Sequence, residues 1–239
     1  LRLRGAVDEQ RGVCDGLGLD LEYHVSPMVG VSIGEEFGMD PGMTFNGQLV
    51  AVLKECGFDR VFDTSLSADL TIMEEGTELL GRLKKALVDK DPDVALPMTT
   101  SCSPGWIKFI EHTFPEYLPN VSTCKSPQQM FGALAKTYYT KMRELDPKDV
   151  VSVSIMPCTA KKFEAKRTEF ATNGLPDVDA VITTQELGRM IKQAGIQFNQ
   201  LTPESMDMPL GFKTGAGVIF GVTGGVSEAV LRYASEKLT

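Results

Sequence analysis

The sequence predicts an α/β protein in which most strands are parallel. Short β-branched, apolar runs alternate along the chain with longer amphipathic stretches of helical period, and this alternation is typical of βαβ units. No internal repeat, low-complexity tract or linker interrupts it. The 239 residues, of which 42% are hydrophobic and 23% charged, suffice for one large domain or two small ones.

The first half of the chain is predicted to form two strands and two helices after an unassigned segment at residues 1–20. These elements are, in order, a strand over residues 21–33, a helix over 44–56, a strand over 60–64 and an amphipathic helix over 68–88. The turn expected within the first strand lies at Ser26-Pro27. Thr44 is a favourable N-cap for the first helix, and Gly57 follows it where glycine is favoured.

The second half continues the alternation. Its predicted strands cover residues 95–101, 150–156, 180–184 and 217–222, and its predicted helices cover 106–114, 126–145, a segment from 161, a segment ending at 194, and the chain from 225 onward. Pro127 opens the longest of these helices at a favoured position. Ligands of such folds bind beyond the carboxyl ends of the strands, and three loops stand out there: residues 99–106, 156–164 and 223–226.

Composition excludes several functions. The net charge is −8 and the chain has no lysine or arginine cluster, so it is a poor candidate for nucleic-acid binding. No apolar run approaches the roughly 18 residues of a membrane span, and no leader pattern opens the chain. Five cysteines, an odd number, predict a reducing, intracellular location. The cytoplasm fits best, with an anaerobic organelle or a chloroplast as alternatives.

The first segment whose residues could take part in catalysis or metal binding is TTSCSPGW at residues 99–106. Cys102 is predicted to lie between a strand end and a helix start, where the helix dipole and free amides favour a thiolate. Such a thiol suits a nucleophile, a metal ligand or a proton carrier. A small buried core residue is an equally good interpretation of Cys102 taken alone.

The second segment, MPCTAKKFE at residues 156–164, repeats this arrangement around Cys158. Lys161 and Glu164 are three residues apart and therefore neighbours on a helix surface. A lysine at this strand end can hold an anionic or dipolar ligand, although a solvated first turn is favoured for the segment in isolation.

Two further segments are weaker candidates for a functional site. Glu74, Glu75, Glu78 and Arg82 lie on one predicted helix, and a solvated face is the favoured interpretation by itself. The glycine-rich residues 215–225 miss the dinucleotide-binding fingerprint and indicate close backbone packing.

Taken together, these segments resemble the catalytic domain of [FeFe]-hydrogenases. The first is similar to that family's signature T-S-C-C-P-G-W, and the second to M-P-C-x-x-K-x-x-E. The resemblance extends through residues 70–76, 122–129, 181–187 and 224–226, and covers roughly residues 25–236.

The resemblance implies two α/β lobes, each with a small, mostly parallel sheet flanked by helices, and an active-site cleft between them. It also implies an H-cluster, in which a [4Fe–4S] cubane is joined to a two-iron subcluster, and the reversible reduction of protons to H2. Residues 21–239 are then a partial catalytic domain. A ferredoxin-like electron carrier and H-cluster maturation proteins are the implied partners.

The resemblance also assigns roles to individual residues. Cys158 matches a cubane ligand, and Cys102 matches the cysteine that exchanges protons with the two-iron unit. The positions that match the cofactor pocket are Lys161, Met156, Gln128 and Pro27. The positions that match the proton relay are Glu75, Glu78, Arg82 and Ser122, so the resemblance reverses the preference for a solvated helix face.

The chain also departs from the family pattern. Ser103 stands at a cluster-ligand position where the family has cysteine, and an alkoxide is a poorer ligand for such a cluster. The family's C-x-x-x-C, which supplies two further ligands, is absent, so we expect this chain alone to be inactive. Met28 and Gly30 replace a small residue and an arginine of the pocket.

Three interpretations remain. The chain is part of an [FeFe]-hydrogenase, or a non-catalytic sensor or iron–sulfur assembly relative that has lost the ligand at Ser103, or a metal-free thiol enzyme that uses Cys102. The retained Lys161, Cys102 and glutamate helix favour the first.

Overall fold

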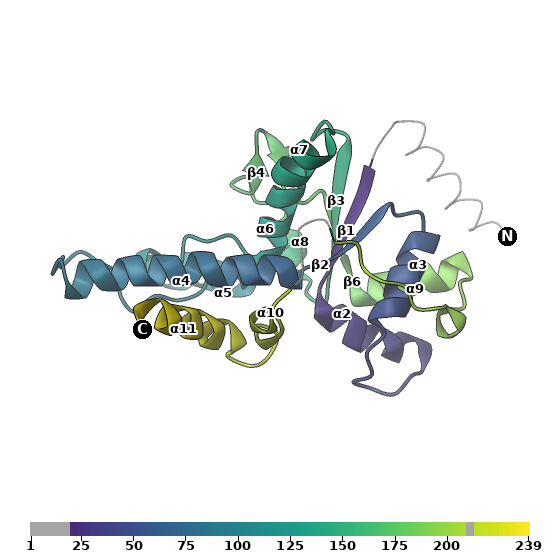
Figure 1. Ribbon diagram of the computed structural model, residues 1–239, viewed down its shortest axis with the longest axis horizontal. Helices are drawn as coiled ribbons and strands as arrows, with labels where there is room; N and C mark the ends of the chain where they lie inside the picture. The colour runs from purple at the N-terminus through teal and green to yellow at the C-terminus, as the bar shows by residue number, and fades with distance from the viewer. Residues whose placement is uncertain (1–19, 209–212) are drawn as a thin grey trace. The chain divides into compact units, whose positions relative to one another are not determined.

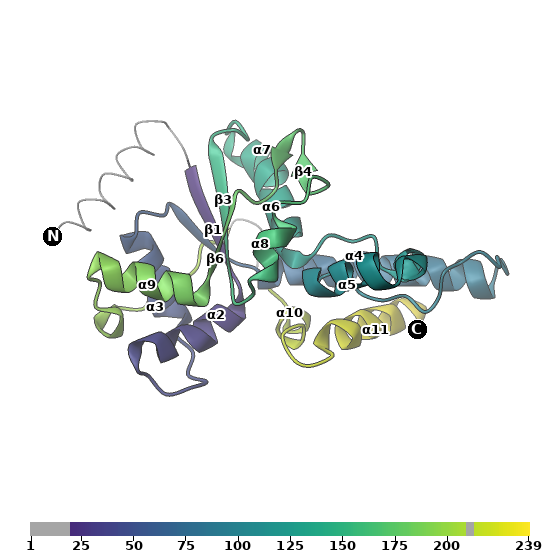
Figure 2. The same cartoon turned by 180° about the vertical axis from the view of Figure 1, so that it is seen from behind.

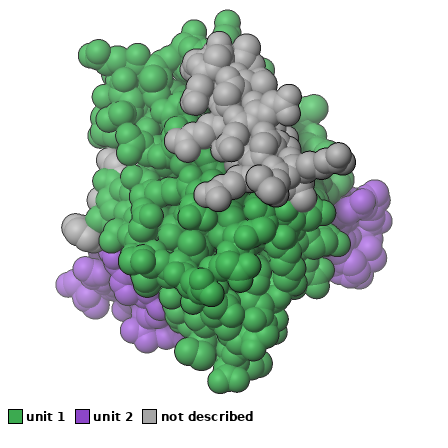
Figure 3. All heavy atoms as spheres, turned by 90° about the vertical axis from the view of Figure 1, so that its right-hand side faces the viewer, with its two compact units in different colours: residues 1–64, 131–211 green, residues 65–130, 212–239 purple. Residues whose placement is uncertain are grey.

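The structure, a computed structural model, describes residues 20–208 and 213–239. The chain divides into two compact units, residues 1–64 with 131–211 and residues 65–130 with 212–239 (Figure 3). The unassigned segment that we predicted at the start of the chain lies, except for its last residue, outside the described residues.

Unit 1 is built on a parallel sheet of order β2-β1-β3-β6 (Figure 1). Its strands are β1 (Asp20–Val25), β2 (Arg60–Asp63), β3 (Val150–Met156) and β6 (Ala180–Thr183). The predicted α/β class with parallel strands is therefore confirmed. The first strand ends earlier than predicted because Pro27 opens a helix at the position where its missing N–H costs nothing.

One face of this sheet carries the apolar core of unit 1. The helices packed on it are α2 (Pro27–Ser32), η1 (Ile33–Phe37), α3 (Asn46–Glu55) and α9 (Thr184–Ala194). Tyr23, Val25 and Ile155 point into this core from the strands. α3 begins after Phe45 without a side-chain cap, so the N-cap predicted at Thr44 is wrong. α9 starts with a capping box between Thr183 and Glu186.

The opposite face is covered by a broken helix. The helix predicted over residues 126–145 is α6 (Pro127–Leu134), a π-helical turn η3 (Ala135–Tyr139) and α7 (Thr140–Arg143). Phe131 and Tyr139 pack against Phe62 of β2. The short elements that complete unit 1 are α8 (Ala160–Glu164), β4 (Ala171–Thr172), β5 (Leu175–Pro176) and η4 (Phe198–Gln200).

Unit 2 is helical over its described residues. It contains α4 (Ser65–Leu87), α5 (Pro104–Thr113), η2 (Pro115–Asn120), α10 (Gly215–Ile219) and α11 (Gly225–Leu238). α11 lies along α4 (Figures 1 and 2). Gly76 allows this approach, because a Cβ there would overlap the ring of Tyr233.

Two predicted strands are wrong. Residues 217–222 form most of α10 and the turn after it, because Thr214 caps that helix through Ala216 N and Gly217 fits closely against the backbone of Ser65. Residues 95–101 make one isolated parallel bridge, Thr99 to Val121. Pro97 has no N–H to donate, which helps to keep this segment from extending a ladder.

Among the described residues, no helix combines the length and apolar character that crossing a membrane requires.

Candidate functional site

The predicted site residues of unit 1 gather at the carboxyl edge of its sheet. Met156 is the last residue of β3 and is buried. Cys158 follows two residues later as a half-buried free thiol, just before α8 begins. Pro27 opens α2 directly after β1, at the same edge because the strands are parallel. The order strand, cysteine, helix that the sequence predicted is confirmed here.

Lys161 is a nearly buried cation with a buried partner. Its Nζ lies 3.1 and 3.3 Å from the two carboxylate oxygens of Glu164, and the side chains are 12% and 4% exposed. The interpretation as a solvated turn is therefore wrong for this pair. Burial and, to a smaller extent, the charge of Lys161 lower the pKa of His24 to about 3, so this imidazole is neutral.

Met28 and Gly30, the two positions at which the predicted pocket departs from the family pattern, differ in their exposure to solvent. Met28 is exposed, whereas Gly30 is buried. A Cβ at Gly30 would overlap Oδ1 of Asn46, so an arginine fits there only if Asn46 moves.

In unit 2, α4 holds the predicted relay on one face. Glu78 Oε1 accepts from the Arg82 guanidinium at 2.6 Å, and Glu78 Oε2 accepts from Ser122 Oγ at 2.8 Å and from Thr123 N at 3.0 Å. Burial alone would raise the pKa of Glu78, but the hydrogen bonds from Ser122 and Arg82 outweigh it and lower this pKa. Glu78 is thus held ionised.

Glu75, one turn earlier, is in the opposite state. Its side chain is fully buried, and Oε1 accepts from Ser101 N at 3.2 Å and Ser101 Oγ at 3.5 Å. Burial raises the pKa of Glu75 in spite of these bonds and the nearby Ser122 hydroxyl. Two carboxyls whose pKa values are shifted in opposite directions therefore stand one turn apart, an arrangement suited to proton transfer.

Arg82 fixes the segments that surround the pair. Besides binding Glu78, its guanidinium donates to three backbone carbonyls, those of Ala95 at 3.0 Å, Pro119 at 2.9 Å and Val121 at 3.0 Å. This set keeps Ser122 next to α4.

The other predicted residues of unit 2 lie in the loop before α5 and in α6. Cys102 is half-buried and precedes Pro104, the first residue of α5, by two positions. Ser103 is exposed at the N-cap position, and its hydroxyl does not cap the helix. Gln128 is buried in the first turn of α6.

The sequence interpretation missed two residues that bind the glutamates. Ser101 holds Glu75, and Thr123 holds Glu78 through its N–H. Each is adjacent to a residue that we did single out, Cys102 or Ser122, which was the available signal. The neighbouring Cys124 also donates its thiol toward Glu78 Oε2, at 3.7 Å.

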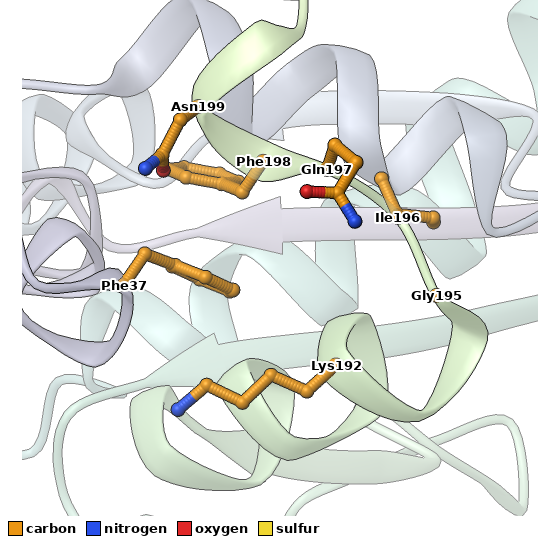
Figure 4. Close-up of a pocket in the computed structure, with 7 residues that line it drawn as sticks. All are labelled: Phe37, Lys192, Gly195, Ile196, Gln197, Phe198 and Asn199. Carbon is orange, nitrogen blue, oxygen red and sulfur yellow. The ribbon is translucent and has the colours of Figure 1, made fainter.

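A separate hollow in unit 1, of about 240 Å³, contains none of these residues (Figure 4). Lys192, which lines it, is paired with Glu36 at 3.4 Å and lies over the ring of Phe37. Its charged group is therefore already occupied by structural contacts.

The donor chemistry fits an iron–sulfur cluster in part. Cys158 offers a free thiol at a strand end, three residues before Lys161, and cysteine is the usual ligand of such clusters. Over the described residues, however, no group of three or more histidine, cysteine, aspartate or glutamate side chains converges as a metal site. The part of the chain that the structure describes therefore offers single candidate ligands, without a converging set.

Comparisons with known proteins identify the family of the chain. Residues 21–239 match the family described as "Iron only hydrogenase large subunit, C-terminal domain". The chain is 55% identical over 214 residues to the NADP-reducing hydrogenase subunit HndD of Solidesulfovibrio fructosivorans, and 49% identical to the periplasmic [Fe] hydrogenase large subunit of Nitratidesulfovibrio vulgaris. The matches cover 90% of this chain but 36% and 50% of those proteins.

A solved structure from work on stepwise H-cluster assembly, that of [FeFe]-hydrogenase HydA(deltaEFG), matches with a TM-score of 0.81 and 49% identity, covering 90% of this chain and 52% of that one. A cytosolic Fe-S cluster assembly factor, narfl of Xenopus tropicalis, is more distant at 36% identity over 90% of this chain and 45% of that protein. The chain belongs to the iron-only hydrogenase large subunits, as part of their C-terminal, H-cluster domain.

Proposed function

We propose that the protein containing this chain is an [FeFe]-hydrogenase that interconverts protons and H2, and that unit 2 conducts its protons. The observation that carries this proposal is the glutamate pair of α4. The pKa of Glu75 is raised, that of Glu78 is lowered, and the Ser122 hydroxyl interacts with both. A proton relay requires donors and acceptors in this alternation, whereas a structural helix face does not.

When bound, the H-cluster supplies the redox chemistry of the reaction. In the proposed site Cys158 is one thiolate ligand of the cubane, and Lys161, held by Glu164, presents its ammonium to the two-iron subcluster. Met156, Gln128 and Pro27 line the pocket, and Cys102 takes the proton-exchanging role. That these residues share one cleft between two lobes stays a prediction.

The protons follow the residues of unit 2. Glu75 gives up the proton that burial keeps on it, and it is recharged through Ser122 from Glu78. Arg82 keeps Glu78 ionised and therefore ready to accept a proton from the surface. Each transfer moves one proton onward while another replaces it.

The alternative is a non-catalytic relative, such as an iron–sulfur assembly protein. Ser103 at a ligand position favours it, because serine is the poorer ligand. The intact relay of α4 and the buried Lys161–Glu164 pair favour a hydrogenase, since an assembly protein has no use for a proton route. The higher identity to hydrogenases than to the assembly factor points the same way.

The partners and compartment belong to this proposal as well. A ferredoxin-like carrier supplies electrons, and maturation proteins install the two-iron subcluster. The compartment stays a prediction, and one relative is named as periplasmic.

The test is H2 evolution by the full-length protein, matured and supplied with a reduced carrier. We expect Glu78→Gln to lower turnover by about 10² to 10³, the usual contribution of a positioned proton-transfer group. Glu228→Gln is the matched control, because Glu228 pairs with Arg232 at the same spacing but on the exposed face of α11. An inactive wild type, or equal activity of both variants, would refute the proposal.

A further inference from the structure

One face of the sheet in unit 1 is polar, and no role assigned above uses it. Glu22 and His24 alternate on β1, and the register places Ser152 beside Glu22 and Ser154 beside His24. All four residues are fully buried. Strands buried on both faces are usually apolar throughout, as the opposite face of this sheet is.

Several atoms on this face make no hydrogen bond of ordinary geometry with a described residue, although the Tyr139 hydroxyl lies near enough to Glu22 to lower its pKa. They are both carboxylate oxygens of Glu22, Nε2 of His24, Oγ of Ser152 and Oη of Tyr139. More than nine in ten buried polar atoms in proteins are bonded, to ordered water where no protein group is in reach. A cluster of such atoms therefore indicates a wet face.

The π-helical turn η3, which helps to cover this face, lies next to a cavity. Tyr139 ends η3, and π-helical turns are frequent at functional sites. Tyr139 also lines a cavity of about 200 Å³ together with Arg60, the first residue of β2. This cavity lies at the amino edge of the sheet and has room for several waters.

The protonation states suit proton transfer. Burial, with a smaller contribution from Asp20, raises the pKa of Glu22 to about 8, although Tyr139, Lys136 and Arg60 act against both. Glu22 is thus protonated at neutral pH. Lys136 is itself neutralised by Asp179 at 2.9 Å.

At the other end, neutral His24 shares Nδ1 with Thr64 Oγ1 at 3.3 Å, while Nε2 has no partner among the described residues. A neutral imidazole can accept a proton at one nitrogen and release one from the other. Thr64 follows β2 at the carboxyl edge, the edge that carries Lys161 and Cys158.

We propose that the polar face of β1 and β3 holds a file of bound water that carries protons from the cavity at Arg60 and Tyr139, through Glu22, to His24 and Thr64. Each step passes one proton forward and receives one from behind, so no net charge accumulates. The file needs no residue of the α4 relay. Only its purpose, a second proton supply, rests on the proposed function.

Infrared difference spectra of this chain in H2O and D2O test the file without any cluster. Subtracting the Glu22→Gln spectrum from that of the wild type isolates the Glu22 signal. We expect a protonated-carboxyl band at pH 7 that shifts in D2O while the protein stays folded. Glu35→Gln, on an exposed residue of the same unit, should leave this band in place.

Two results would overturn the file. One is the absence of the band at pH 7, and the other is a band that shifts in D2O only on unfolding, as for a dry carboxyl. Glu22→Leu serves as a folding control, because it should retain the native circular dichroism and lose the band.

The purpose is tested in the matured full-length protein. With the α4 route weakened by Ser122→Ala, Glu22→Gln should lower the residual H2 evolution by about tenfold, and Glu35→Gln should not. Unchanged residual activity would overturn the supply role. An inactive wild type would instead refute the proposed hydrogenase function, and the infrared result would stand by itself.

Discussion

Both units bury glutamates, but they treat the charge in opposite ways. In unit 2, Glu78 receives hydrogen bonds from a guanidinium, a hydroxyl and a backbone N–H, and its pKa falls. In unit 1, Glu22 has no hydrogen-bond donor of ordinary geometry among the described residues, and its pKa rises to about 8. Burial opposes the charged form at both sites. The supply of donors therefore decides which carboxyl stays ionised.

Glu75 shows that this rule works at the scale of one helical turn. It shares α4 with Glu78, but the hydrogen bonds from Ser101 and the nearby Ser122 hydroxyl do not offset its burial, and its pKa is raised. A single turn thus separates a carboxyl whose pKa is raised from one whose pKa is lowered. The predictions below test whether donors, rather than burial, make this difference.

The largest expected effect is the pH dependence that Glu22 gives to the free energy of unfolding. Its pKa is raised on folding, so the folded state retains a proton that the unfolded state loses, and stability falls as pH rises from about 4.5 to about 8. The shift corresponds to about 5 kcal/mol across this window. Glu22→Gln should remove this loss, so that its advantage over the wild type in urea unfolding grows with pH.

Glu35→Gln, on an exposed residue, controls for the removal of one charge. The unfolding free energies of the wild type and of Glu22→Gln could instead change with pH in parallel. That result would show that Glu22 is ionised inside the fold, and the contrast between Glu22 and Glu78 would disappear.

The next effect in size is the loss of Arg82. Arg82→Ala leaves Glu78 and three backbone carbonyls without their donor, and breaking a buried pair in this way costs about 3–5 kcal/mol. Arg232→Ala is the matched control, since Arg232 binds Glu228 at the same spacing and at 2.6 Å but stands exposed. It should cost about 0.3–0.5 kcal/mol in urea unfolding. Similar losses in the two variants would mean that burial adds nothing to the Arg82 pair.

A smaller effect separates the two acids of α4. Glu78→Gln should cost about 1.5–3 kcal/mol at neutral pH, because it weakens hydrogen bonds to a charged group. Since the pKa of Glu78 is lowered on folding, this contribution is present above pH 4.5 and is lost as pH falls further. Glu75→Gln should show the reverse, becoming more favourable as pH rises. Acid titrations of unfolding free energy in both variants measure this, and slopes of equal sign would contradict it.

The sequence predicted what depends on local pattern. The strand expected over residues 150–156 is β3, residue for residue, because a β-branched apolar run has few other solutions. α4 was likewise expected over residues 68–88 and covers Ser65–Leu87. The spacing of Glu78 and Arg82 indicated their pairing. In these cases the determining contacts lie within a few residues along the chain.

What the sequence could not predict depends on distant partners. Two of the donors that lower the pKa of Glu78, Ser122 and Thr123, come from a loop more than forty residues away. The polar face of β1 depends on its register with β3, which local alternation does not specify. Residues 217–222 have the composition of a strand, yet close packing of Gly217 against Ser65 accompanies a helix that ends at Ile219 and a turn after it.

The smallest expected effect shows that a lowered pKa does not by itself mean a strong contact. The hydrogen bond from Lys162 lowers the pKa of Glu186 to about 2, with help from the backbone N–H of Thr183. Both side chains of the pair are more than a third exposed, so water screens their attraction. Lys162→Ala should therefore cost at most about 0.5 kcal/mol in urea unfolding, whereas Glu186→Ala, which also breaks the capping box at Thr183, should cost about 1 kcal/mol. If Lys162→Ala were the costlier change, the charge pair rather than the backbone cap would stabilise this turn, and donors at the surface would count as much as those around Glu78.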